Sequence, residues 1–444
     1  MELSSLSRFV WGPEMMVAFL LVGAYLSVRT GFIQITKLGV VFREVLGAIR
    51  ERRHFAPRRI TPFQATMIAL GGTMGQGNLI GVTSAILVGG PGAIFWMWLA
   101  GFLGMAVKFA EATLAVHYRV RFSDDSVSGG PMYYLSRGLP KSLSWLGAVY
   151  ALFAAVAAFG IGNLTQSAAM AGGLESAFGV PPGITGLFVA VAAGVILAGG
   201  ATRIARVAEV LVPLMVLAFL AAGLVALFFH AAEVPAALAA IFEGAFGLKA
   251  ALGGTAGYAL AETLKAGVGR GIFSNEAGLG SAAIAHAQAD VDHPVRQGFW
   301  GVAEVFLDTL VINTLMAIIV LTSGAYQLAK GAPAAFVAAW TFPGGSTLAA
   351  AILALFVFTT LLSWGFYGEE AASYLFGEGV RWPYRIAYVV FALVGALGGF
   401  ELFIAVADIM NGLMAIPNLI GLVLLSGVVS RLVREFFQGL PWRE

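Results

Sequence analysis

Long apolar segments, separated by short polar ones, fill the chain from end to end. About 20 consecutive apolar residues are needed to cross the hydrocarbon of a bilayer. Eleven segments meet this requirement, at residues 9–28, 62–88, 91–116, 143–170, 183–200, 206–229, 258–286, 298–322, 347–375, 384–399 and 401–428. We therefore predict an all-α polytopic membrane protein with about 11 transmembrane helices.

Two of these segments are weakened in the middle by glycine and polar residues. Residues 69–81 read ALGGTMGQGNLIG, and residues 271–280 read GIFSNEAGLG. Glycine disfavours helix by roughly 1 kcal/mol relative to alanine, and backbone freed at membrane depth must line a cavity or find partners. This pattern predicts two interrupted helices. Close packing of helices at small residues is the alternative, but it does not explain the neighbouring Gln76, Asn78, Ser274 and Asn275.

The two interrupted segments divide the chain into corresponding halves. Segments two to six and seven to eleven form two groups of five, each beginning with an interrupted helix. An odd number of crossings gives the groups opposite orientations, which predicts a five-plus-five inverted repeat with one extra N-terminal helix. The expected units are a helix and cytoplasmic amphipathic loop at 1–61, repeats at 62–229 and 258–428, and a cytoplasmic tail at 429–444.

Composition and charge agree with this plan and orient it. The chain is 59% hydrophobic and 11% charged, whereas soluble domains are about 25% charged. With the N-terminus outside, 20 of the 26 Lys and Arg residues fall in inside loops or the tail and 3 fall outside. Basic residues concentrate on the cytoplasmic side, so we predict the N-terminus outside and the C-terminus in the cytoplasm.

The first interruption offers sites for two kinds of charge. A helix that restarts near Gln76 exposes N–H groups that suit a carboxylate. The preceding half-helix ends with unpaired carbonyls, which suit a cation such as sodium. Asn78 can donate and accept hydrogen bonds, so it either bridges the two sites or pins the interruption.

Other polar and aromatic residues at membrane depth are candidates for the same site. Phe159, Asn163 and Gln166 share one helix face, which lines either a cavity or a helix–helix contact. Phe273 suits a lid over a small side chain. Near Trp364, Thr359 and Thr360 supply hydroxyl oxygens.

Charged residues within the segments have alternative interpretations. Lys108 and Glu111 are read as a pair at the inner end of their helix. Glu276 is read as structural, with Lys265 and Arg270 as candidate partners. Two further carboxylates, at Glu304 and Asp308, are four residues apart and suit a proton or cation site. The chain contains no cysteine and no HExxH, P-loop or GxSxG motif, so we predict no enzymatic activity and no catalytic residues.

Five stretches carry a family resemblance over essentially the whole chain. They are GQGNLIGVTSAILVGGPGAIFWMWLAGFLGMAVKFAEATLAVHYR (75–119), GGPMYYL (129–135), FGIGNLTQS (159–167), GIFSNEAGLGSAAIAHA (271–287) and HPVRQGFWG (293–301). In this order they resemble the alanine/glycine:cation symporter family, also called sodium:alanine symporters. The resemblance implies a fold of the leucine-transporter type in a bacterial or archaeal plasma membrane. It also implies sodium-coupled symport of alanine and glycine, with no nucleic-acid partner.

The resemblance also assigns residues to the two ligands. For the amino acid it implies Gln76, Gly77, Asn78, Phe159, Phe273, Ser274, Asn275 and Trp364, and we add Asn163, Gln166 and Thr360 as further candidates. For sodium it implies Gly71, Met74, Phe356, Thr359 and Thr360. Family members often carry Thr or another small residue where this chain has Gln76, so substrate preference stays open, D-alanine included.

Two other functions remain open at this point. Proton-coupled amino-acid transport would use Glu276, Glu304 or Asp308. A ligand-gated channel or nutrient sensor on the same scaffold is the alternative from another class.

Overall fold

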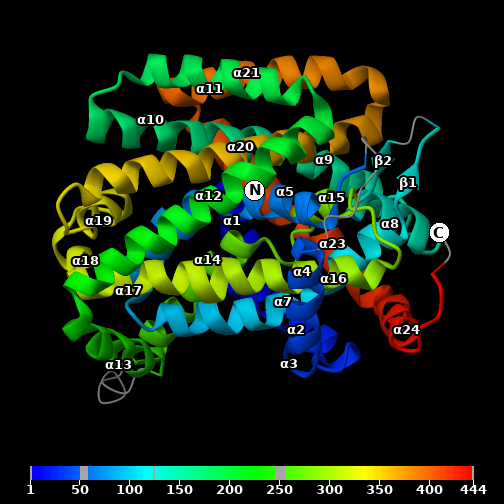
Figure 1. Ribbon diagram of the computed structural model, residues 1–444, viewed down its shortest axis with the longest axis horizontal. Helices are drawn as coiled ribbons and strands as arrows, with labels where there is room; N and C mark the ends of the chain where they lie inside the picture. The colour runs from blue at the N-terminus through cyan, green and yellow to red at the C-terminus, as the bar shows by residue number, and fades with distance from the viewer. Residues whose placement is uncertain (1–2, 51–58, 124–125, 247–255, 443–444) are drawn as a thin grey trace.

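A computed structural model describes residues 3–50, 59–123, 126–246 and 256–442, and nearly all of the regular structure in it is helical (Figure 1). The elements up to residue 245 are α1 (Leu3–Val10), α2 (Pro13–Arg29), α3 (Ile33–Thr36), α4 (Leu38–Arg50), α5 (Pro62–Thr73), η1 (Gly77–Gly81), α6 (Val82–Gly89), α7 (Ala93–His117), β1 (Val120–Arg121), β2 (Val127–Ser128), α8 (Pro131–Gly138), α9 (Leu146–Phe159), η2 (Gly160–Leu164), α10 (Thr165–Phe178), α11 (Pro182–Leu197), α12 (Gly200–Phe229), η3 (Ala231–Glu233) and α13 (Val234–Ala245).

The remaining elements follow the second of the two weakened segments. They are α14 (Ala256–Asn275), α15 (Ser281–His286), α16 (Pro294–Val305), η4 (Phe306–Asn313), α17 (Thr314–Ser323), α18 (Ala325–Leu328), α19 (Ala332–Ala338), α20 (Gly345–Phe376), η5 (Glu378–Val380), α21 (Arg381–Leu397), α22 (Glu401–Leu413), α23 (Ala415–Leu424) and α24 (Ser426–Phe437). The segments η1, η2 and η4 are π-helical, and β1 pairs with β2 in an antiparallel hairpin.

Within the described residues, seven helical segments are long and apolar enough to cross a membrane. They are Ala93–His117, Leu146–Phe178, Gly200–Phe229, Pro294–Ser323, Gly345–Phe376, Glu378–Leu397 and Glu401–Leu424. Two shorter apolar segments are Gly77–Gly89 and Pro182–Leu197. The count is lower than the eleven expected for three reasons. The first interruption ends α5 after 12 residues, and α2 and α11 have only 17 and 16 residues. Helix α14 is long enough but carries three charged residues.

The first expected interruption is present, between α5 and η1. Local signals start α5 sharply: Thr61 and Gln64 form a reciprocal capping box, and Pro62 occupies the first helical turn. The α-helix ends at Thr73, and η1 begins at Gly77. The prediction of a broken helix here is confirmed.

The second expected interruption separates α14 from α15. It spans residues 276–280, where Glu276 has φ of 53°, and Gly278 and Gly280 have φ of 89° and 80°. Positive φ is common for glycine but rare for a residue with a side chain. The carboxylate of Glu276 is therefore carried on a backbone turn that ordinary helix cannot provide.

Helix α7 packs against both the second interrupted helix and the helix that follows it. It contacts α14, α15 and α16, and its second half is almost wholly buried. Helix α20 packs similarly against α5, α9, α10 and α12. These two long helices hold the interrupted segments from different sides.

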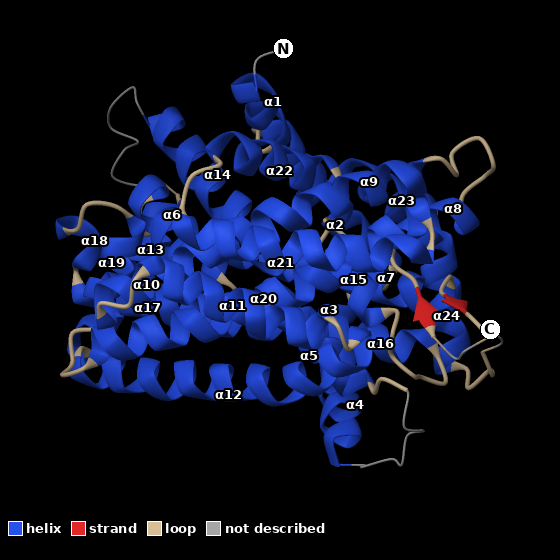
Figure 2. Ribbon diagram, turned by 90° about the horizontal axis from the view of Figure 1, so that it is seen from above, coloured by secondary structure: helices blue, strands red, loops and turns tan. Residues whose placement is uncertain are grey.

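The connecting elements gather at two ends of the molecule. Figures 1 and 2 show α13, α18 and α19 at one end and β1, β2, α8 and α24 at the other. The C-terminus lies at the same end as the hairpin. The long connections therefore emerge on opposite sides of the packed helices.

The polar loop after the first apolar segment contains the expected amphipathic helix. Helix α4 packs against α16 and buries Val41. Glu44 on this helix forms an ion pair with Arg296 on α16. Three arginines expected to mark the inner side, Arg52, Arg53 and Arg58, lie outside the described residues.

Candidate functional site

The two interruptions contact each other inside the protein. Asn78 in η1 donates through Nδ2 to the Ser274 hydroxyl near the end of α14, at 2.9 Å. A Cβ on Gly77 would lie 3.4 Å from the Phe273 ring. Residues almost 200 positions apart in sequence thus meet where both helices lose their regular form.

Oxygen atoms from the first interruption and from α20 converge beside Thr360. Its Oγ1 lies 3.0 Å from the carbonyl oxygen of Gly71, 3.2 Å from that of Met74 and 3.1 Å from that of Phe356. The Thr359 hydroxyl also donates to the Phe356 carbonyl, at 2.9 Å. All five residues expected for sodium are therefore neighbours in the structure.

The chemistry of this group fits a hard monovalent cation. A hydroxyl has one hydrogen to donate, yet Thr360 faces three carbonyl oxygens within 3.2 Å. The oxygens left over are the type of ligand that sodium accepts. Glycine at residue 75 permits the approach, because a Cβ there would lie 2.6 Å from the Thr360 hydroxyl.

A small cavity adjoins these oxygens and lies between the interruptions. It is lined by Gly72, Thr73, Gly75, Gly77, Ile161, Gln166, Phe273, Glu276, Thr360, Trp364 and Asn411. Its volume is about 10 Å³, which is close to the least space that holds one water molecule. The cavity is thus nearly closed in this conformation and is built of both polar and aromatic groups.

Glu276 brings a carboxylate to the wall of this cavity. The Trp364 indole N–H donates to its Oε1 at 3.0 Å, and the Ser281 hydroxyl donates to Oε2. Neither Lys265 nor Arg270, the partners suggested by the sequence, forms a described ion pair with it. The carboxylate is therefore held by neutral donors from α20 and α15.

The Gln166 side chain reaches the restart of the first interrupted helix. Its Oε1 accepts from the Gln76 backbone N–H at 3.4 Å, and its Nε2 donates to the Ile161 carbonyl. The amide expected to bind a substrate carboxylate is thus weakly covered by Gln166. The Gln76 side chain itself is not part of the cavity wall.

Two of the residues expected at the amino-acid site lie in helix–helix contacts instead. Asn163 donates to the Tyr388 carbonyl at 2.6 Å. Phe159 packs its ring against three aromatic side chains of α21, those of Tyr384, Tyr388 and Phe391. The sequence left open whether this helix face lines a cavity or a helix–helix contact. Asn163 lies in a helix–helix contact, and Gln166 lines the cavity.

Three further candidates lie behind the cavity, in a buried polar cluster. Asn78, Ser274 and Asn275 bond there to side chains of η4 rather than facing the open space. The η4 partners are Asp308, Thr309 and Asn313. Asn78 also accepts from the Gly75 backbone N–H at 3.1 Å, so it pins the interruption.

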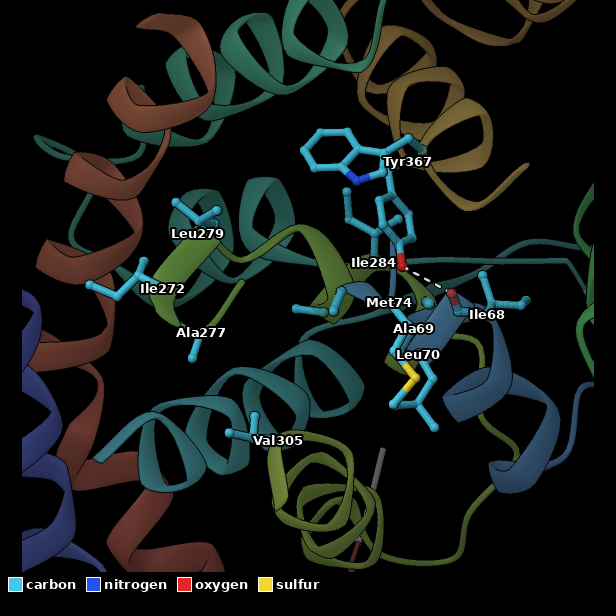
Figure 3. Packing of buried hydrophobic residues seen from close by; sticks show 14 of the residues in the cluster. Ile68, Ala69, Leu70, Met74, Ile272, Ala277, Leu279, Ile284, Val305 and Tyr367 are labelled. Carbon is cyan, nitrogen blue, oxygen red and sulfur yellow. Dashed lines mark hydrogen bonds between the residues drawn. The ribbon is translucent and has the colours of Figure 1, made fainter. Parts of the chain in front are cut away.

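Sequence reasoning missed Asn313 for a geometric reason. It lies five positions after Asp308, a spacing that places residues on different faces of an α-helix. In the π-helical η4 the hydrogen bonding is i to i+5, and both side chains reach Asn78. Tyr367, also missed, directs its hydroxyl at the Ile68 carbonyl of α5, at 3.3 Å (Figure 3).

The interpretation of Lys108 needs correction. It is fully buried and lies 3.5 Å from Glu304 on α16, instead of extending to the membrane surface with Glu111. The second carboxylate oxygen of Glu304 contacts His286 Nε2 at 2.6 Å. Sequence spacing suggested Glu111 because it is three residues away, whereas the ion pair joins helices far apart in the chain.

Two larger cavities are present in addition to the central one. The first, of about 320 Å³, includes Trp11, Glu262, Arg270, Asp408 and Phe273, and Phe273 also belongs to the central wall. The second, of about 290 Å³, lies near the hairpin end and is lined by charged residues, among them Arg59, Asp290, Glu370 and Arg381. Phe273 therefore lines both the central cavity and the first of the two larger ones.

A helical membrane protein with paired interruptions, converging oxygen ligands and a small central cavity belongs to the secondary transporters as a class. The chain matches the sodium:alanine symporter family over residues 2–441 and belongs to that family.

Known relatives extend over almost the entire chain. The sodium/alanine symporter AgcS of Methanococcus maripaludis is 41% identical over 98% of this chain and 96% of its own length. The probable sodium/glutamine symporter GlnT of Bacillus subtilis is 36% identical over 96% and 88%. Among solved structures, the manganese transporter of Eremococcus coleocola is similar in fold, with a TM-score of 0.53 and 14% identity over 86% of this chain and 88% of that one.

Proposed function

We propose that the protein is a sodium-coupled symporter of small neutral amino acids, with alanine and glycine as substrates. The observation that carries the proposal is the cluster of five oxygen atoms around Thr360 and the Phe356 carbonyl, directly beside a cavity bounded by both interrupted helices. A sodium ion at Thr360 would tie α5 to α20 and so order the wall of the amino-acid site.

The walls of the cavity indicate how an amino acid is held. The backbone N–H groups of Gln76 and Gly77 face the carboxylate, and Gln166 moves aside from Gln76. The Glu276 carboxylate faces the ammonium group. Phe273 and Trp364 close around the side chain, which favours a methyl group or hydrogen over anything larger.

Transport follows from alternating access to this site. Phe273 lines both the central cavity and the cavity of about 320 Å³, and the charged cavity is lined by residues near the hairpin. Binding shifts the balance between conformations only through different affinities for them. Sodium and amino acid together favour the closed form, from which opening toward the cytoplasm releases both.

The predicted topology belongs to the same proposal. Residues 62–229 and 258–428 form the two five-helix repeats, with the N-terminus outside and the C-terminus in the cytoplasm of a bacterial or archaeal cell. Its support is that the hairpin, α8 and α24, all in segments expected inside, share one end of the molecule, while α13, α18 and α19 share the other (Figure 2).

Uptake into proteoliposomes tests the proposal. Labelled L-alanine is expected to accumulate under an inward sodium gradient and to be displaced by unlabelled glycine. Unlabelled D-alanine and L-glutamine in the same assay define stereochemistry and size. Absence of sodium-driven accumulation of every amino acid, in protein that elutes as a folded species, overturns the proposal.

Proton coupling is the second candidate, and the buried Asp308 favours it. Its carboxylate is fully buried at membrane depth, where an ionisable group marks an ion pathway. If a pH gradient drives alanine accumulation in sodium-free buffer, the coupling ion is the proton rather than sodium.

A further inference from the structure

The charged residues of α14 all line one cavity. Glu262, Lys265 and Arg270 belong to the wall of the cavity of about 320 Å³, here called the α14 cavity, together with Phe273. At positions i, i+3, i+8 and i+11, these four side chains share one side of a helix. A charged side chain within a membrane-spanning segment needs water, a partner or a ligand. This side of α14 therefore serves the cavity rather than the lipid.

The facing helix α22 contributes a carboxylate to the same cavity. Asp408 is half-buried there, and Arg270 acts on it electrostatically. Among the described residues, however, no ion pair joins Arg270 to Asp408, or Glu262 to Lys265. Opposite charges that line one cavity without touching leave room for a ligand that carries both charges. An amino acid is such a ligand, because its carboxylate suits a guanidinium and its ammonium group suits a carboxylate.

The charged cavity near the hairpin shows the opposite arrangement. Asp290 there forms ion pairs with Arg59, at 3.2 Å, and with Arg121, at 3.6 Å. Glu369 forms ion pairs with Arg385 and Arg381. Charges paired in this way hold neighbouring segments together and are not available to a ligand. The α14 cavity differs because its own charges stay unpaired within the described part of the chain.

The rest of the α14 cavity wall is largely apolar. The rings of Trp11 and Phe273 meet edge to face, with their centroids 6.1 Å apart, and Met16 and Val88 add aliphatic surface. A volume of about 320 Å³ falls within the range of about 300–1,000 Å³ typical of small-molecule sites. The central cavity has only about 10 Å³. The α14 cavity therefore has room for a longer side chain than the central one has in this conformation.

We propose that the α14 cavity is a second amino-acid site, for a neutral amino acid with a larger apolar side chain than alanine. Arg270 binds the carboxylate of this ligand, and Asp408 binds its ammonium group. The apolar side chain packs against Trp11 and Phe273. The inference rests on the proposed function, because it takes the central cavity as the site of the transported amino acid.

Occupancy of this site is expected to inhibit transport. Phe273 lines both cavities, so a ligand packed against its ring in the α14 cavity holds the ring over the central cavity. The central cavity then cannot open on this side. A larger amino acid is thus bound without being carried across the membrane, and it slows the passage of alanine.

Binding of labelled L-methionine to the protein in nanodiscs tests the site, because its thioether suits an aromatic wall. With sodium and just enough unlabelled alanine to fill the central site, about one methionine per protein is expected to bind in addition. Arg270→Gln is expected to weaken this binding by about tenfold, as for the loss of a hydrogen bond to a charged group. Asp408→Asn should act similarly. Lys330→Gln changes an exposed basic residue outside the cavity and is the matched control.

Uptake into proteoliposomes gives the matching transport result. Unlabelled methionine is expected to slow sodium-driven uptake of labelled alanine, whereas labelled methionine should not accumulate. The methionine concentration that halves alanine uptake is expected to rise by about tenfold in Arg270→Gln. This concentration is compared within each variant, so it does not depend on how fast the variant transports alanine.

Three results would overturn the second site. They are displacement of methionine by the alanine concentrations that fill the central site, accumulation of labelled methionine, and equal methionine binding by Arg270→Gln, Asp408→Asn and Lys330→Gln. If Arg270→Gln does not fold, methionine binding to the wild-type protein with alanine present decides. Absence of sodium-driven alanine uptake, with methionine binding that still depends on Arg270, overturns the proposed function and leaves the α14 cavity as an amino-acid site.

Discussion

Both interrupted helices free backbone N–H and carbonyl groups from helical hydrogen bonds. These groups find different kinds of partner at the two interruptions. At the first interruption α5 stops at Thr73 and η1 begins at Gly77, so only a short stretch departs from helix. Two carbonyl oxygens near the end of α5, those of Gly71 and Met74, face a single hydroxyl on α20. These two carbonyl oxygens can bind an ion in place of the hydrogen of the Thr360 hydroxyl.

The second interruption has its backbone groups taken by buried side chains. The N–H of Gly278 donates to Glu111, and its carbonyl accepts from the Asn418 amide. Glu276, at positive φ, is held by Trp364 and Ser281. The comparison teaches that the first interruption offers its backbone to a ligand, whereas the second is a fixed support that presents a carboxylate.

The largest expected effect is a loss of stability in Glu111→Ala, because Glu111 holds the backbone of the second interruption. The variant leaves the Gly278 N–H buried without its acceptor and the Asn418 amide with only the Gly278 carbonyl, which is expected to cost about 3 kcal/mol of stability. Thermal unfolding in detergent measures it, with Glu111→Gln as the control that keeps an acceptor oxygen. Wild-type thermal stability in Glu111→Ala would show that the second interruption is not held in this way.

A methyl group at the first interruption is expected to act on transport instead. In Gly75→Ala the new Cβ lies 2.6 Å from the Thr360 hydroxyl, and such overpacking is expected to reduce sodium-driven uptake by about 100-fold. Gly172→Ala is the matched control, because nothing lies within 4 Å of a Cβ there. Equal uptake by both variants would contradict the close approach of Gly75 to the Thr360 hydroxyl.

Removing one oxygen from the cation group gives a smaller and more specific effect. Thr360→Ala is expected to raise the sodium concentration for half-maximal uptake by about tenfold, because one ligand is lost. Thr360→Ser keeps the hydroxyl and should stay near wild type. The proposal for this site fails if the sodium dependence of Thr360→Ala is unchanged.

The smallest expected effect concerns the carboxylate of the second interruption. Trp364→Phe keeps an aromatic wall but removes the indole N–H that Glu276 accepts at 3.0 Å. Apparent alanine affinity is expected to fall by about fivefold, in line with about 1 kcal/mol for one hydrogen bond. Sodium affinity should change less than alanine affinity. An equal fall in both affinities would contradict the different roles assigned to the two interruptions.

Much of the architecture could be predicted from local sequence. Apolar segment length indicated a polytopic membrane protein, and glycine with polar neighbours located both interruptions. The five residues assigned to sodium by resemblance lie together, and their binding role stays a proposal. These features depend on residues close in sequence or on motifs shared by a family.

Contacts between distant helices could not be predicted in the same way. Spacing paired Lys108 with Glu111, whereas the structure pairs it with Glu304 on another helix. Asn163 and Gln166 share a helix face in sequence but face α21 and the cavity, respectively. The reach of Asn313 to Asn78 depends on the π-helical form of η4.

By itself, the sequence determined that the chain crosses a membrane and where two of its helices break, because hydrophobicity and glycine content act locally. Only the tertiary structure decided which buried charges are paired and which are not. A buried carboxylate is neutralised by whatever the packing of several helices brings within a few ångströms. For Glu304 that packing supplies Lys108, whereas the hydrogen-bond partners that the described residues supply to Asp308 are the neutral side chains of Asn78, Ser274 and Thr309.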